Sequence, residues 1–79
     1  NEAAIDDLLA VANIGITLRD SGQTQRATRV FEALIAAYPE SSIGWYELAV
    51  LWSELGEPQQ AFPLLEKAIA LEPQAFRFR

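Results

Sequence analysis

The chain has 79 residues, 51% of them hydrophobic, with no cysteine, no histidine and a formal net charge of −5. The lack of cysteine and histidine removes disulfides, thiolate metal ligands and the commonest general base. A chain of this size forms one domain that buries only about 60% of its unfolded surface, and its acidic balance disfavours nucleic acid or an anionic membrane as a partner.

The first half of the sequence predicts two helices. One should cover residues 3–20, with Asp6 and Asp7 in an early turn where carboxylates favour the helix dipole. Its apolar stripe comprises Leu8, Val11, Ile14, Gly15 and Leu18. A second helix should run from Thr24, as N-cap, to about residue 38, before Pro39. Its inward side chains are expected to be Val30, Phe31, Leu34 and Ile35.

The second half predicts another two helices. Ser41 or Ser42 should cap a helix that runs to about residue 55. Its expected core residues are Trp45, Leu48, Ala49, Trp52 and Leu55. A fourth helix should follow Gly56 and end near Leu71, with Glu57 as cap and Pro58 at its first position. Pro63 lies beyond the first turn, so we expect a kink or a loosened turn there.

The two halves repeat each other with a constant offset of 34 residues. Gly22 and Gly56 form one such pair. The other pairs are Ala27 and Ala61, Pro39 and Pro73, Val11 and Trp45, Ile14 and Leu48, Leu18 and Trp52, Phe31 and Leu65, and Leu34 and Ala68. A fixed period of this length indicates two copies of one helical hairpin.

Each copy has small residues where two helices should cross. Gly15 and Ala49 occupy one such position, and Ala27 and Ala61 occupy another. A larger side chain there would hold the two backbones apart.

From Trp45, the second copy reads W-x-x-L-A-x-x-W, followed by Gly56, Ala61, Leu65, Ala68 and Pro73. This pattern resembles the tetratricopeptide repeat. The first copy is looser, with Val11 where the family favours Trp. The resemblance implies an all-α fold of two tandem helix-turn-helix hairpins that form a short right-handed α-solenoid. The expected domain covers residues 1–79, with repeats at about 8–41 and 42–75 and a tail at 76–79.

The resemblance also implies a protein-binding function, because stacked hairpins present a concave face built from the first helix of each unit. Here that face would comprise Leu9, Ala12, Asn13, Ile16, Ile43, Tyr46, Glu47 and Val50. This mainly apolar set favours an apolar peptide segment or an amphipathic helix as ligand, in an adaptor or chaperone-like role, with Tyr46 as the anchor. A chaperone-tail clamp is not expected, because Ala12 and Ile16 stand where basic or amide side chains would be needed.

The alternative interpretation is a self-associating or truncated scaffold, whose concave face is filled by another subunit or by missing repeats. The chain does not start with Met, and repeat arrays generally need about three units, so we expect a fragment. The segment 74–79 alternates aromatic and basic residues, so it is either a docking tail or an interface cut short.

Catalysis is not expected, and we predict no catalytic residue, no metal site and no cofactor. The chain shows no phosphate loop, nucleophile elbow or paired-carboxylate motif. No apolar run is long enough to span a bilayer, and the N-terminus lacks the basic start of a signal peptide. A cytoplasmic location is therefore the default expectation for this chain. The expected partner is a protein or peptide, or a second copy of the chain, and not nucleic acid or a membrane.

Overall fold

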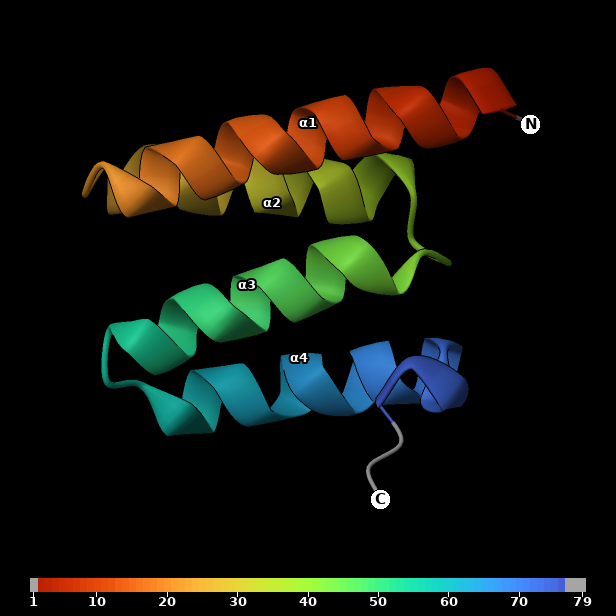
Figure 1. Ribbon diagram of the computed structural model, residues 1–79. Helices are drawn as coiled ribbons and strands as arrows, with labels where there is room; N and C mark the ends of the chain where they lie inside the picture. The colour runs from red at the N-terminus through yellow and green to blue at the C-terminus, as the bar shows by residue number, and fades with distance from the viewer. Residues whose placement is uncertain (1, 77–79) are drawn as a thin grey trace.

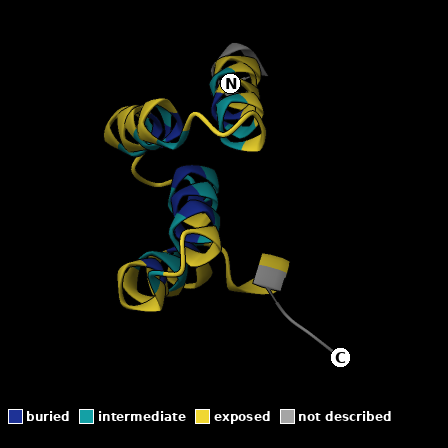
Figure 2. Cartoon of the chain, turned by 90° about the vertical axis from the view of Figure 1, so that its left-hand side faces the viewer, coloured by how far each residue is buried: buried dark blue, intermediate teal, exposed yellow. Residues whose placement is uncertain are grey.

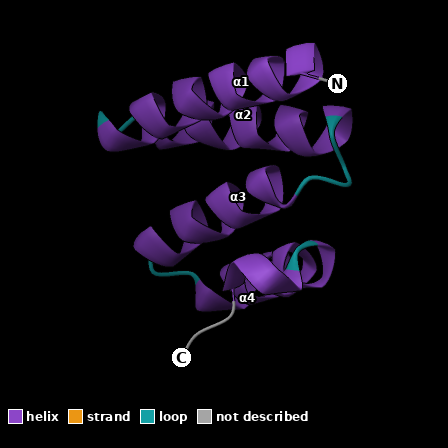
Figure 3. Cartoon of the chain, turned by 45° about the vertical axis from the view of Figure 1, so that its right-hand side comes forward, coloured by secondary structure: helices purple, strands orange, loops and turns teal. Residues whose placement is uncertain are grey.

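The computed structural model describes residues 2–76, and it describes the side chains of residues 6–75. The described chain forms α1 (Glu2–Asp20), α2 (Thr24–Ala37), α3 (Ser42–Glu54) and α4 (Pro58–Leu71), followed by the short 3-10 helix η1 (Pro73–Phe76) (Figure 1). Residues 2–76 contain no strand (Figure 3). The all-α prediction is confirmed. The expectations for the tail at 76–79 concern the Phe76 side chain and residues 77–79, which lie outside the described part.

The four helices form two hairpins that stack on each other. α1 packs against α2, α3 packs against α4, and α3 lies on the first hairpin, mainly against α2 (Figure 1). Viewed along the helix axes, α1 and α3 lie toward one side and α2 and α4 toward the other (Figure 2). The 34-residue offset holds in the structure, because α1 and α3 end at Asp20 and Glu54 while α2 and α4 begin at Thr24 and Pro58.

Both hairpin turns use a left-handed glycine, as the sequence predicts. Gly22 has a φ of 83° and Gly56 a φ of 78°. After α1, the Gln23 N–H donates to the Leu18 carbonyl at 2.8 Å and the Gly22 N–H donates to the Arg19 carbonyl at 3.0 Å. These two bonds form a Schellman motif, which satisfies carbonyls that the end of the helix leaves unpaired.

The helix starts differ in part from the predictions. Thr24 is the first residue of α2, and the N-cap is Gln23, whose carbonyl already accepts the N–H of Ala27 at 3.0 Å. The predicted serine cap of α3 is confirmed, because the Ser41 hydroxyl accepts the Ile43 N–H at 3.3 Å. Glu57 occupies the N-cap position of α4 without a side-chain bond. The prediction of Thr24 as the N-cap is therefore wrong, and α2 begins without a side-chain cap.

α4 runs through Pro63 without interruption. Pro63 is exposed, and so is Gln59, whose carbonyl would otherwise accept the bond that proline cannot donate. Water can reach this carbonyl, so the missing bond does not end the helix.

The core consists of two clusters that join the hairpins. Ala27 and Phe31 pack with Leu48 and Leu51, while Leu8, Ala12 and Leu34 form a second cluster that Ile43 contacts. The predicted close crossing at Gly15 is confirmed, because a Cβ added there would lie 2.4 Å from the Phe31 ring. The first hairpin therefore has room for Phe31 only because position 15 lacks a side chain.

Ile14 does not belong to the buried stripe that the sequence predicts for α1. It is 55% exposed, whereas its repeat equivalent Leu48 is 5% exposed. Leu48 packs against the preceding hairpin, and no described hairpin precedes α1. The position in the array, and not the residue type, explains this difference.

Candidate functional site

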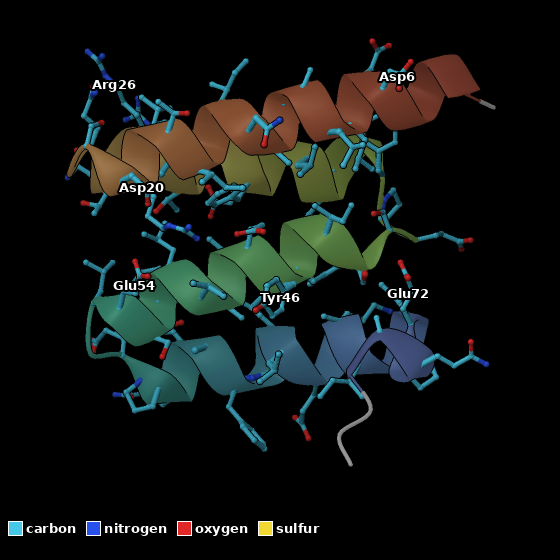
Figure 4. The ribbon with its side chains drawn as sticks, in the orientation of Figure 1. Asp6, Asp20, Arg26, Tyr46, Glu54 and Glu72 are labelled. Atoms are coloured by element: carbon cyan, nitrogen blue, oxygen red, sulfur yellow. The ribbon has the colours of Figure 1, made fainter. Side chains whose placement is uncertain are left out.

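Two adjoining hollows of about 410 and 490 Å³ lie along the junction between α3 and α4. They share Tyr46 and Leu65, so they adjoin each other, and together they are here called the α3/α4 groove. Tyr46 projects from α3 on the side of α4 (Figure 4). The apolar walls of the groove consist of Ile43, Tyr46 and Val50 from α3 and Phe62, Leu65 and Ile69 from α4.

The groove exposes large apolar side chains. Phe62 is 62% exposed, and Tyr46 and Ile69 are each 39% exposed. A contiguous apolar surface on a small protein is typical of an interaction site, because water disfavours its exposure. The groove is therefore the strongest candidate for a binding surface in the described chain.

The polar residues around the groove are neutral or acidic. Ser53 and Glu54 border one end and Glu47 the other, and neither hollow is lined by lysine or arginine. The Glu47 carboxylate lies 3.0 Å from Arg19 of α1, and both side chains are mostly buried. Glu54 is 3.8 Å from the same guanidinium but remains 59% exposed. The groove therefore disfavours an acidic ligand.

Three contacts fix the start of α3 relative to its surroundings. The buried Ser42 hydroxyl donates to the Glu72 carboxylate at 2.8 Å, which ties the N-terminal end of α3 to the C-terminal end of α4. The Lys67 ammonium lies 5.7 Å from the centre of the Trp45 ring, within the range of a cation–π interaction. The Trp45 indole N–H donates to the Pro39 carbonyl at 3.0 Å. The first two contacts link the α3 and α4 walls of the groove, and the third ties α3 to the turn that precedes it.

The α1 part of the predicted binding face is divided between surface and core. Leu9 is 45% exposed and Asn13 is exposed. Ala12 is 4% exposed because it packs with Leu8 and Leu34, so it offers little surface to a partner. Ile16 is half-buried against the cluster around Phe31.

The α3 part of the predicted face borders the groove. Ile43, Tyr46, Glu47 and Val50 all line it, although Ile43 also packs against the first hairpin. The structure thus brings these residues together with α4.

The α4 wall of the groove was missing from the sequence-based set. The repeat offset contained the signal for it, because Leu65 and Ile69 are the equivalents of Phe31 and Ile35. In the first hairpin those two residues pack against α3, whereas their equivalents line a hollow that only Ala75 of η1 borders besides α3 and α4. Both repeats have the same core pattern, so the pattern alone does not show that Leu65 and Ile69 lack the helix that packs on Phe31 and Ile35.

Two further classes of site are not found within the described part of the chain. No cluster of three or more acidic side chains there is arranged to hold a metal ion. None of its helices combines the length and apolar character needed to cross a bilayer.

The comparison with known families decides the classification. A family model described as tetratricopeptide repeat matches residues 13–76, which is most of the chain. The chain belongs to the tetratricopeptide repeat family. Tetratricopeptide repeats generally serve as protein–protein interaction modules, typically without catalysis. No curated protein matches the chain.

Proposed function

We propose that this tetratricopeptide repeat domain binds an apolar helical segment of a partner protein in the α3/α4 groove. The observation that carries the proposal is the uncovered apolar surface of Tyr46, Phe62 and Ile69 between two helices. An amphipathic helix would place apolar residues at every third or fourth position along such a groove, the usual mode for helix-in-groove recognition.

The groove also supports a choice of ligand charge. Its border contains Glu47 and Glu54 and no basic residue, while the chain carries a net charge of −5. A helix that is apolar on one face and neutral or basic on its flanks would bind without like-charge repulsion. Acidic helices and nucleic acid are poor candidates for the same reason.

Binding, and not catalysis, is the proposed activity. The sequence contains no histidine or cysteine. Tyr46 is the proposed anchor, and Ile43, Glu47 and Val50 complete the α3 wall. Leu9 and Asn13, which α1 exposes, remain a predicted extension of the binding face. Ala12 and Ile16 would act indirectly, by supporting the helices that carry the surface.

The test is selection of binders from a library of random helical peptides of about 15 residues, a length that matches about four helical turns. Selected peptides should show apolar residues spaced three and four apart. Their affinity, measured by fluorescence anisotropy, should fall by about tenfold or more for Tyr46→Ala and Ile69→Asp, because truncation of a central anchor typically costs more than 1 kcal/mol.

Leu55→Asp is the matched control, since Leu55 is an exposed apolar residue that lines neither hollow of the groove. It should leave peptide affinity unchanged. The proposal would be overturned if the selected peptides bound the groove variants as tightly as they bind the unsubstituted domain. A selection that yields no binder would also overturn it. A large fall in melting temperature for Tyr46→Ala would instead assign Tyr46 to the core.

A further inference from the structure

Large apolar side chains are exposed mainly at the two ends of the stacked hairpins. Leu9 and Ile14 are 45% and 55% exposed on α1, and Tyr46, Phe62 and Ile69 are exposed in the α3/α4 groove at the other end. Within residues 6–75, the remaining exposed large apolar residue is Leu55, which follows α3. Each end thus presents an uncovered apolar surface.

The junction inside the molecule shows how such surfaces fit together. Leu48 and Leu51 of α3 pack with Phe31 of α2, and Gly44 of α3 lies against Ile35. Glu47 of α3 forms its 3.0 Å ion pair with Arg19 of α1. α3 is therefore held on the first hairpin by apolar packing and by one ion pair.

The receiving half of this junction recurs at the α3/α4 groove. Adding 34 to the residues that receive α3 converts Ile16, Arg19, Phe31 and Ile35 into Val50, Ser53, Leu65 and Ile69. All four of the resulting residues line the groove. The groove is thus a second copy of the surface on which α3 sits.

Most of the inserted half recurs on α1. Subtracting 34 from Ile43, Gly44, Glu47, Leu48 and Leu51 gives Leu9, Ala10, Asn13, Ile14 and Thr17. All five of the resulting residues are exposed in α1, and the polar Thr17 stands in place of the buried Leu51. Both halves of the internal junction are therefore largely repeated, on opposite sides of the two hairpins, where no described α-helix packs on them.

We propose that α1 of a second copy of this chain binds in the α3/α4 groove. It would pack there as α3 packs on the first hairpin. The inference rests on the proposed function, because it names the helix that fills the same groove. Repetition of this contact joins copies head to tail. Because the two surfaces differ, the contact is heterologous and adds copies in an open row.

The polar residues of the new junction are compatible. The internal pair of Glu47 with Arg19 is replaced by Asn13 of one copy opposite Ser53 of the next. An amide and a hydroxyl can form a hydrogen bond, and neither leaves an unpaired charge in the contact. The apolar contacts are supplied by Ile14 against Leu65 and by Leu9 at the start of the helix.

Three features make this junction weaker than the internal one. Thr17 replaces Leu51, so one buried apolar contact is missing. Ala10 is the equivalent of Gly44, where a Cβ would lie 3.0 Å from an Ile35 carbon. In the new junction, the Cβ of Ala10 therefore requires the helices to separate by a few tenths of an ångström at Ile69, the equivalent of Ile35. Each copy also carries a net charge of −5. Repulsion between acidic copies is screened by salt, so association should strengthen as the ionic strength rises.

The test is sedimentation velocity of the 79-residue chain from about 10 µM to about 1 mM, since self-association depends on protomer concentration. The mass should rise with concentration beyond a dimer, and more steeply in about 0.5 M than in about 0.05 M NaCl. Ile14→Asp, which alters the inserted surface, and Ile69→Asp, which alters the groove, should each remain monomeric. Leu55→Asp, outside both surfaces, should associate as the natural chain does.

An equimolar mixture of Ile14→Asp and Ile69→Asp decides the geometry. The first variant has an intact groove and the second an intact α1 surface, so the mixture should form one-to-one dimers that grow no further. Circular dichroism of each variant checks that the helices remain. A natural chain that stays monomeric throughout, or a mixture that does not pair, would overturn the inference.

The two proposals fail in different ways. A monomeric chain whose groove still binds selected peptides would remove the second copy as occupant and leave the proposed function standing. In that case the groove would be open to another protein. Loss of peptide binding together with monomeric behaviour would remove both proposals.

Discussion

Of the four glycines, Gly15 has the closest neighbour, which is the ring of Phe31. Phe31 is fully buried, and a Cβ at position 15 would lie 2.4, 2.8 and 2.9 Å from three carbons of its ring. Gly15→Ala should lower the free energy of unfolding by about 1–3 kcal/mol through overpacking, even though alanine favours a helix more than glycine by about 1 kcal/mol. Chemical denaturation followed by circular dichroism measures this loss.

The second repeat supplies a compensating change. The equivalents of Gly15 and Phe31 are Ala49 and Leu65, so a small side chain there accompanies a smaller partner. Gly15→Ala combined with Phe31→Leu should lose at least about 1 kcal/mol less than the sum of the single losses, as expected for coupled neighbours. Additive losses would show that the Gly15 contact with Phe31 does not limit the packing of α1 on α2.

At the scale of single elements, Pro63 weakens α4. The helix continues through it, so one internal hydrogen bond is missing at an exposed position. Pro63→Ala should restore that bond and stabilise the domain by about 1–3 kcal/mol, since interior proline costs about 3 kcal/mol relative to alanine in a free helix. The melting temperature should rise by about 4–8 °C for each kcal/mol in a domain of this size.

Pro58 provides the matched control, because it occupies the first turn of the same helix, where the N–H has no intrahelical partner. Pro58→Ala should change the melting temperature little. If Pro63→Ala destabilised the domain, the ring of Pro63 would have to make packing contacts that outweigh the lost bond.

At the scale of the whole molecule, Arg19 links the two hairpins through its ion pair with Glu47. Their side chains are 14% and 17% exposed, so Arg19→Met would leave a mostly buried carboxylate without its cation. We expect a loss of about 1–3 kcal/mol, the usual cost of leaving a buried donor or acceptor without its partner. Thermal denaturation at low and moderate salt measures it.

A second substitution separates the ion pair from the packing of the Arg19 stem. Glu47→Gln in the Arg19→Met background should recover part of the loss, because it removes the unpaired charge. Glu54→Gln should have an effect within about 0.5 kcal/mol, since Glu54 is largely exposed and its distance to Arg19 is 3.8 Å. A loss for Glu54→Gln as large as that for Arg19→Met would assign the link to Glu54.

Much of the fold was predictable because its causes are local. The left-handed turns need a residue without a Cβ, which identifies Gly22 and Gly56, and Pro58 starts a helix where its missing N–H has no cost. The cap of α2 was not predictable from Thr24, because the hydrogen bonds of the preceding turn place the cap at Gln23. The α4 wall of the groove was missed because periodicity identifies apolar residues but does not show what covers them.

The sequence by itself determined the repeat, the family and the positions of the helices, since each depends on spacing and on residues that suit one backbone conformation. Only the tertiary structure decided which apolar residues are core and which are surface. Leu48 is buried and its equivalent Ile14 is exposed, although both positions follow the same pattern. The physical reason is that burial in a repeat array depends on the neighbouring hairpin, and no described hairpin lies on the outer side of α1.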